Sequence, residues 1–377
     1  MRKEDKWKLA HLFGTIYDVE EALAMMEVLA DGAPTCGPKV AKFEQKFAKY
    51  IGVKHAIAVN SCASALHLSA IALGIGPGDE VIVPTLTFRA SANVFAFQGA
   101  KIVFAEPDPR TFNIDPTKIK QKITKRTKAI VVVHMCGQPC EMDLINEIAK
   151  ERKIAVIEDA AHAIGAEYKG RKVGTLGDIS AFSFHQCKNM STLGEGGMVA
   201  TNNDEYAEKI KLYRTHGGAH GAGVYIGLNY RMTDVQAAVG IVQLDKIDKH
   251  NEIRRKLAHY LTDLLKEIKG IILPYEMKNV KHVYHLYNIL IEPDIIGMDR
   301  DTFIKRLLDK EGITAITQYF PPVHLLKAYQ ELGHRQGECP IAEDLTKRIV
   351  TLPISPRFTF DDMKFMGESI KRVIKGQ

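Results

Sequence analysis

One lysine stands in a sequence setting that suits covalent chemistry. Lys188 lies four residues beyond the apolar run Ile179–Phe184 and just before the glycine-rich turn Gly194–Gly197. An amine that is fixed at the end of a strand, away from bulk water, can become nucleophilic enough to form a Schiff base with an aldehyde. A single lysine is more often a solvated surface charge, so this interpretation depends on what accompanies it.

An acidic residue and a stretch of small residues follow two other apolar runs. Asp159 comes directly after Ile154–Glu158, and the stretch Ser61–Ala70 follows His55–Asn60. A carboxylate in such a place suits the protonated ring nitrogen of pyridoxal phosphate, and small residues at a helix start let backbone N–H groups approach a phosphate. Each segment also has a purely structural interpretation, as the cap of a turn or of a helix.

The elements around these residues predict that they meet. Between residue 55 and about residue 202, short β-rich runs alternate with helical stretches, which is typical of a mostly parallel sheet covered by helices. In such a sheet, ligands bind beyond the carboxyl ends of the strands. The predicted strands are His55–Asn60, Glu80–Pro84, Lys101–Glu106, Ala129–Met135, Ile154–Glu158, Ile179–Phe184 and Met198–Thr201, with helices at Ser61–Leu73 and Asp143–Arg152.

The remaining segments predict a two-domain chain. Two amphipathic helices lead into the sheet, and an α+β unit of long charged helices follows it. We place the boundary near Lys246, so that residues 1–245 form the large domain, with a helical lead-in over residues 1–54, and residues 246–377 form the small one. The supporting segments are helices at Val19–Leu29, Val40–Tyr50, Thr233–Ile268 and Arg300–Lys310 and a strand-like run at Tyr284–Ile291.

Composition narrows the class of protein. The chain has 377 residues, of which 46% are hydrophobic and 25% charged, as in globular enzymes with a large core. It has no apolar run of about 18 residues and a charged start, so we expect a cytoplasmic protein. Basic and acidic residues are interspersed despite a net charge of +6, which argues against a nucleic-acid surface. The six cysteines are scattered, which predicts reduced thiols, and we expect no metal site.

The motifs together resemble a known family. Their order is NSCASALHLSAIALGIGPGDEVIVPTLTF, IEDAAHAIGAEYKGRKVGTLGD, SFHQCKNMSTLGEGGMVATN, LNYRMTDVQAAVG, HVYHLYNI and YFPPVH. From about Tyr17 to the C-terminus, the chain is similar to the DegT/DnrJ/EryC/StrS family of sugar aminotransferases. The resemblance implies a fold-type-I enzyme of the aspartate-aminotransferase architecture that uses pyridoxal phosphate and passes through pyridoxamine phosphate.

The resemblance also implies a set of cofactor contacts. Lys188 matches the Schiff-base lysine, and Asp159 matches the carboxylate on the ring nitrogen. The further matches each concern one part of the cofactor. They are His162 near its phenolic oxygen, Phe88 stacked on its ring, Ser183 with a hydroxyl that reaches its phosphate, and Cys62 with Ala63, whose backbone N–H groups donate to that phosphate. Where the family commonly has a threonine, this chain has Ala63, so Ser61 or Ser64 is expected to replace its hydroxyl.

Four further residues match positions near the substrate or the partner subunit. Asn229 matches a residue that reaches the cofactor phosphate of a partner, which implies a homodimer with shared active sites. Arg231, Tyr319 and His324 match positions near the substrate, although an exposed charge or a packed proline-rich loop explains them equally well. Glu195, in the glycine turn, is interpreted as a turn residue.

The implied reaction is the transfer of an amino group from an amino acid, with L-glutamate as the expected donor, to a nucleotide-linked keto sugar. An aminotransferase acting on a cyclitol ketone stays open, because the substrate pocket is lined by variable loops such as Arg214–Ile226. A dehydratase of the same family is disfavoured because those relatives carry histidine at the position of Lys188. A non-catalytic regulator is disfavoured because Lys188, Asp159 and the glycine turn are all retained.

Overall fold

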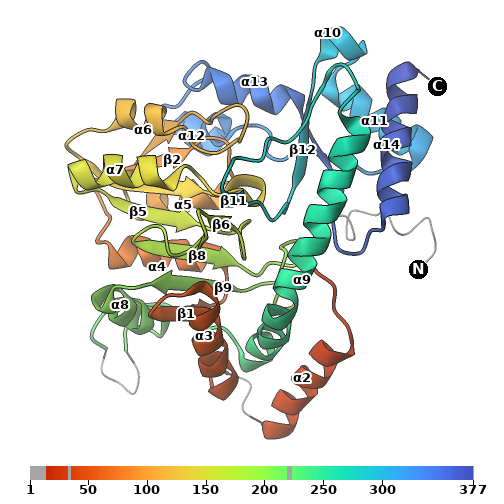
Figure 1. The fold of residues 1–377 in the computed structure, drawn as a ribbon. Coiled ribbons are helices and arrows are strands. Elements are labelled where there is room, and N and C mark those ends of the chain that lie inside the picture. Colours follow the sequence, from red (N-terminus) through yellow and green to blue (C-terminus); the bar gives the residue numbers. More distant parts are fainter. Residues whose placement is uncertain (1–13, 33–34, 219–222, 377) are drawn as a thin grey trace.

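The structure is a computed structural model that describes residues 14–32, 35–218 and 223–376 (Figure 1). Its centre is a seven-stranded sheet in the order β1-β9-β8-β5-β4-β2-β3. Strand β9 is antiparallel to both of its neighbours, and the other pairs are parallel. The strands are β1 His55–Val59, β2 Glu80–Pro84, β3 Lys101–Ala105, β4 Thr127–Val133, β5 Ala155–Asp159, β8 Ile179–Ser183 and β9 Gly197–Thr201.

Alternating apolar residues bury both faces of this sheet. In β4, Ala129, Val131 and Val133 belong to one hydrophobic cluster, and Ile130 and Val132 belong to the other. Such two-sided burial explains why the strands are continuous apolar runs. The first cluster includes residues of α4 Cys62–Ala72, α5 Ala90–Phe97 and α8 Asp204–Arg214, and the second includes residues of α3 Pro38–Ile51, α6 Pro116–Lys122 and α7 Met142–Arg152.

One long helix serves both domains. Helix α9 (Asp234–Leu265) begins at a capping box formed by Thr233 and Gln236 and runs for 32 residues. Leu244 near its start joins the cluster that contains α3, whereas Leu261 near its end joins the first cluster, which also takes in residues of the small domain such as Phe303. The boundary predicted near Lys246 therefore falls inside a continuous helix, and α2 (Val19–Asp31) packs against the same helix.

The small domain contains a three-stranded antiparallel sheet in the order β10-β12-β13. The strand predicted from Tyr284 begins only at Tyr287, because Tyr284 has a positive φ of 43° and its N–H donates to His282 Nδ1. The elements are β10 Ile271–Ile272, β12 Tyr287–Ile291, α10 Pro293–Ile296, α11 Arg300–Glu311, η3 Val323–Leu325, α12 Lys327–Glu331, α13 Pro340–Arg348, β13 Ile349–Leu352 and α14 Phe360–Lys375.

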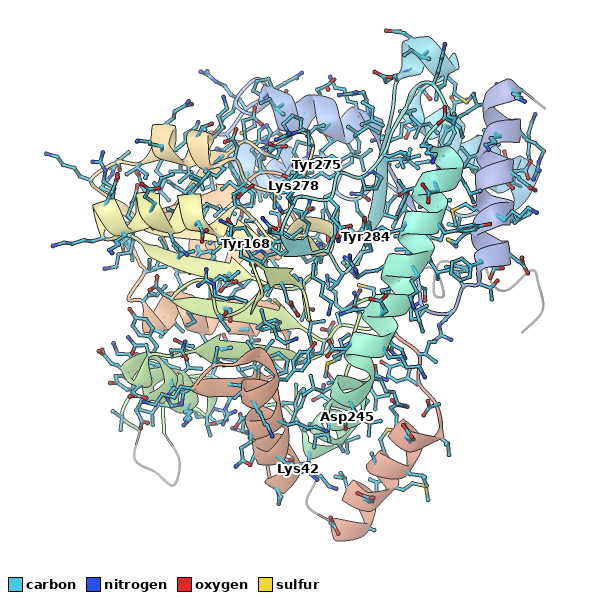
Figure 2. All side chains as sticks on the ribbon, viewed as in Figure 1. Lys42, Tyr168, Asp245, Tyr275, Lys278 and Tyr284 are labelled. Atoms are coloured by element: carbon cyan, nitrogen blue, oxygen red, sulfur yellow. The ribbon has the colours of Figure 1, made fainter. Side chains whose placement is uncertain are left out.

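A short sheet that the sequence did not indicate joins the two domains. Strand β11 (Val280–Lys281) pairs with β6 (Glu167–Tyr168), which in turn pairs with β7 (Arg171–Lys172). The segment that leads into β12 thus contacts the large domain. Figure 2 labels Lys278 in this segment and Tyr168 in β6. In the described part of the chain, no helix is long and apolar enough to cross a membrane.

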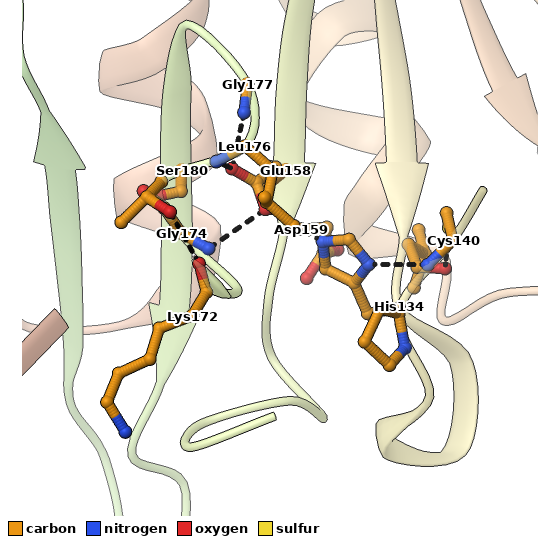
Figure 3. A network of polar contacts seen from close by, with 12 residues as sticks. His134, Cys140, Glu158, Asp159, Lys172, Gly174, Leu176, Gly177 and Ser180 are labelled. Carbon is orange, nitrogen blue, oxygen red and sulfur yellow. Dashed lines mark hydrogen bonds and ion pairs between the residues drawn. The ribbon is translucent and has the colours of Figure 1, made fainter. Parts of the chain in front are cut away.

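A buried hydrogen-bond network fixes the end of β5 (Figure 3). Glu158 is fully buried and accepts the backbone N–H groups of Gly174, Leu176 and Gly177 at 2.6–2.9 Å. Its Oε2 also accepts from His134 Nε2 at 3.0 Å. Because His134 Nδ1 accepts from the backbone N–H of Cys140, the proton of this imidazole must be on Nε2. The network joins the ends of β4 and β5 to the loop that precedes β8.

We expect Glu158→Ala to lower the free energy of unfolding by about 3–5 kcal/mol, because it leaves several buried donors without an acceptor. Chemical denaturation of the cofactor-free protein measures this. Glu151→Ala, at an exposed position of α7, is the matched control and should change the stability by less than about 0.5 kcal/mol. A loss of less than about 1 kcal/mol for Glu158→Ala would show that the network does not hold this part of the sheet.

Candidate active site

A cavity of about 450 Å³ opens where the carboxyl ends of three strands meet the small domain. Strand β9 is antiparallel to β1 and β8, so β1, β8 and β5 all run in one direction and end at one edge. Eight of the predicted site residues line the cavity: Cys62, Ala63, Phe88, Asp159, His162, Ser183, Lys188 and Tyr319. Gln318 joins Tyr319 in the wall that the small domain contributes.

Lys188 lines the cavity from a loop whose two ends are hydrogen-bonded to each other. The N–H of Phe184 donates to Gly196 O at 2.8 Å, and the N–H of Gln186 donates to Gly194 O at 2.9 Å. Gly194 adopts a positive φ of 113°, which lets the chain reverse at this point. The Lys188 side chain is half-buried, and its ammonium group forms no hydrogen bond or ion pair with the described residues. The amine is therefore available to a ligand.

Asp159 is a buried carboxylate that forms no hydrogen bond to a cationic side chain among the described residues. Its oxygens accept from Ser91 Oγ at 2.6 Å and from the backbone N–H of Ala161 at 3.1 Å. Burial raises the pKa of this carboxyl, and the Ser91 hydrogen bond, the Ala161 N–H and the charge of Lys188 oppose the rise. A buried anion in this state is favourable only beside a positive charge. A protonated pyridine nitrogen is a group of that kind.

The start of α4 offers donors for an anion. Ser61 caps the helix by accepting from the N–H of Ser64, while the N–H groups of Cys62 and Ala63 lie in the first turn, where no helix carbonyl precedes them. The positive end of the helix dipole and these free N–H donors together suit a phosphate group. The hydroxyl of Ser64 donates to Asn60 and does not line the cavity, whereas Ser61 does. Of the two serines expected to replace the missing threonine, Ser61 is thus the one in place.

Gly197 keeps the first turn of α4 close to the sheet. A Cβ atom at this glycine would lie 2.5 Å from the carbonyl carbon of Ser61 and 2.8 Å from the backbone nitrogen of Cys62. Real Cβ atoms do not approach backbone so closely, so only glycine fits here. Ser183, paired with Gly197 across the strands, lines the cavity beside this turn.

Two aromatic residues and an imidazole form the remaining walls. The Phe88 ring is 46% exposed within the cavity, and its centre lies 5.9 Å from that of Tyr319. The Tyr319 hydroxyl and His162 Nε2 lie 2.9 Å apart, which joins the small domain to the large one across the cavity wall. Burial, with the nearby Lys188, lowers the pKa of His162 well below its usual range, so the ring is neutral. Its Nδ1 is buried and has no hydrogen-bond partner within residues 14–32, 35–218 and 223–376.

These groups fit pyridoxal phosphate. A free amine, a buried carboxylate, a helix start with free N–H groups and a partly exposed aromatic ring surround one cavity of suitable size. Each of them would suit a different part of the cofactor, namely its aldehyde, ring nitrogen, phosphate and ring face. In the described part of the chain, no group of three or more His, Cys, Asp or Glu side chains is arranged to hold a metal ion.

Three predicted residues lie outside this cavity. Asn229 is exposed, and its side chain accepts from the N–H of Arg231, which is partly exposed. His324 is fully buried, with one ring nitrogen bonded to Thr85 and the other to Glu343, so it does not contact a substrate directly. It holds the segment after β2 that carries Phe88.

Sequence reasoning missed several residues of the cavity. Ser91 bonds Asp159 directly, and Thr87 bonds Ser91 at 2.9 Å. Both follow β2, whose carboxyl end lies at the same edge, so their position after a strand end is the signal that could have identified them. His185 and Cys187, on either side of Gln186, also line the cavity beside Lys188, as does Glu195.

Known proteins share this architecture. Residues 16–371 match the model of the DegT/DnrJ/EryC1/StrS aminotransferase family. GDP-perosamine synthase of Caulobacter vibrioides is 44% identical over 342 residues, covering 90% of this chain and 91% of that protein.

Two solved structures extend the comparison. DesV of S. venezuelae, in complex with a ketimine intermediate, is 35% identical with a TM-score of 0.90, covering 95% of each chain. The PLP form of the putative sugar aminotransferase Spr1654 of Streptococcus pneumoniae is 28% identical with a TM-score of 0.90, covering 97% of this chain and 98% of that one. The predicted α/β fold class and family are confirmed, and the chain belongs to the DegT/DnrJ/EryC1/StrS aminotransferase family.

Proposed function

We propose that this enzyme uses pyridoxal phosphate to transfer an amino group from an amino acid, with L-glutamate as the donor, to the keto carbon of a nucleotide-linked sugar. The observation that carries the proposal is the placing of an unpaired amine, Lys188, and a buried carboxylate without a cation, Asp159, in one cavity. The relative named GDP-perosamine synthase supports a nucleotide-linked sugar as the class of substrate.

The residues of the chain divide the work of holding the cofactor. Lys188 would bind its aldehyde carbon, Asp159 its ring nitrogen, and the start of α4, with Ser61 and Ser183, its phosphate. When bound, pyridoxal phosphate supplies an electron sink for the carbon next to the transferred nitrogen. Phe88 and Tyr319 line the cavity and help to keep water from the reacting atoms.

Lys188 also suits the proton transfer that amino transfer requires. Once released from the cofactor, its amine remains anchored by the loop and can take a proton from the donor carbon and return it to the acceptor carbon. Retention of this lysine argues against the sugar dehydratases of the family, which carry histidine at this position. A cyclitol ketone as acceptor remains the second candidate, and the substrate assay distinguishes it.

We further propose a homodimer in which Asn229 completes the site of the partner. Asn229 is exposed and outside the cavity of its own chain, as a residue with this role must be. Exposed apolar side chains nearby, among them Leu228 and Phe97, support a covered surface here. The substrate class supports the proposal that the enzyme acts in the cytoplasm.

The substrate assay combines L-glutamate with a panel of GDP- and dTDP-linked 3-keto and 4-keto sugars and with a cyclitol ketone. We expect amination of a nucleotide sugar by the wild-type enzyme and a loss of about 10³-fold or more in Lys188→Ala. Lys211→Ala, at an exposed position of α8, is the matched control and should be as active as the wild type. Near-normal turnover in Lys188→Ala, or amination of the cyclitol ketone alone, would overturn the proposal.

Mixed dimers test the shared site. We expect Lys188→Ala and Asn229→Asp to be inactive separately, the second because its carboxylate repels the phosphate of the partner's cofactor. Dimers formed from an equal mixture should recover about a quarter of the wild-type activity, since half of them are hybrids with one intact site. Activity no higher than that of the separate variants would mean that both residues serve the same site.

A further inference from the structure

The residue after Lys188 is buried and uses its whole amide. Asn189 Nδ2 donates to Asn251 Oδ1 at 2.8 Å and to the carbonyl of Val283 at 3.1 Å, and its Oδ1 lies 3.1 Å from His285 Nδ1. Asn189, Asn251 and His285 are all at most 2% exposed. Water therefore cannot replace any of these contacts easily.

Two backbone carbonyls fix the direction of every bond in this network. The carbonyl of Ile164 only accepts, so Asn251 must point its Nδ2 toward it, at 2.9 Å, and its Oδ1 toward Asn189. The carbonyl of Val283 likewise requires Asn189 Nδ2. Asn189 Oδ1 is then left to accept from His285, which must carry its proton on Nδ1.

The network connects the segments that carry the site. Asn189 is covalently joined to Lys188, Ile164 lies two residues after His162, and the ring of His285 is 4.3 Å from that of His162. A Cβ at Gly165 would lie 2.7 Å from Asn251 Nδ2, and the positive φ of 78° at this glycine also disfavours other residues. Packing leaves the amides no room to rearrange.

We propose that Asn189, acting through Asn251 and His285, is a positioning residue that holds Lys188 and the His162 wall in register for amino transfer. The proposal rests on the proposed function, because it assigns Asn189 a role in that reaction. Proton transfer requires the lysine amine to return to within about 3–3.5 Å of the reacting carbon, and displacement by about 1 Å costs about 100-fold in rate. Asn189 anchors the backbone from which that amine extends.

Asn189→Asp tests the polarity with little change of shape. The carboxylate would face Asn251 Oδ1 and the Val283 carbonyl, which both accept. We expect kcat to fall about 100-fold, with the KM for glutamate within about threefold of the wild type. Relative to the wild type, activity should recover as the pH falls, because the protonated acid regains a donor. The ionisable groups around His285 are His162, Lys188, Arg254 and His185, and they are unchanged in both proteins.

A second pair of variants keeps the test decisive if Asn189→Asp folds poorly. His285→Asn places an amide N–H where Nδ1 was, whereas His285→Leu has a similar shape and no donor. We expect His285→Asn to keep a kcat at least tenfold above that of His285→Leu, with both measured at a temperature at which each protein is fully folded. His285→Leu should also have the lower unfolding midpoint, because it leaves Asn189 Oδ1 without a donor. Equal kcat values for the pair, or a wild-type kcat in Asn189→Asp, would overturn the proposal.

Nitrogen NMR of the cofactor-free protein separates this proposal from the proposed function. Shifts of ¹⁵N-labelled histidine, assigned with His285→Asn, should show His285 as the neutral Nδ1–H form, and the opposite form would overturn the network. If wild-type protein reduced with borohydride in the presence of pyridoxal phosphate carried no adduct on Lys188, the proposed function would fail, whatever the NMR result.

Discussion

Two consecutive buried carboxylates at the end of β5 govern the rest of the site. Glu158 has its charge fully satisfied by His134 and three backbone N–H groups of the following loop. From the residues that the structure describes, Asp159 accepts hydrogen bonds from one hydroxyl and one N–H, and from no cation. The folded chain thus keeps one anion for its own architecture and leaves the other for a ligand. A buried charge without a partner is costly, so the ligand that supplies the cation gains that energy on binding.

The other groups around Asp159 determine which ligand fits the cavity. Parallel strands bring Lys188 and the start of α4 to the edge at which Asp159 lies, and the small domain closes the cavity with Gln318 and Tyr319. His324, buried between Thr85 and Glu343, keeps the segment with Phe88 in place from the side of the small domain. The cavity accordingly depends on the packing of both domains against α9, although most of the polar groups in the cavity come from the large domain.

Much of this architecture is predictable from the sequence, because each strand appears as a local pattern of apolar residues. Each of the seven predicted strands coincides with an observed one to within two residues at either end, since a strand buried on both faces is a short apolar run. Lys188, Asp159 and the helix start at Cys62 and Ala63 follow from strand ends. The family resemblance supplied the other predicted residues of the cavity, which are Phe88, His162, Ser183 and Tyr319. The role of His324 and the exposure of Asn229 depend on tertiary packing, which no local pattern reports. Ser91 and the Asn189 network were missed because hydrogen-bond partners far apart in sequence leave no periodic signal.

The most direct test concerns the charge of Asp159 in the cofactor-free enzyme. Because burial raises its pKa, the native state holds this proton more tightly than the unfolded chain, and the group costs stability as the pH rises above about 4. Unfolding of the wild type and of Asp159→Asn is compared between about pH 4.5 and pH 7.5. We expect the asparagine variant to gain stability relative to the wild type as the pH rises, and pyridoxal phosphate to reverse that gain. A stability difference that changes neither with pH nor with the cofactor would contradict the claim that the Asp159 carboxylate is left for the cation of a ligand.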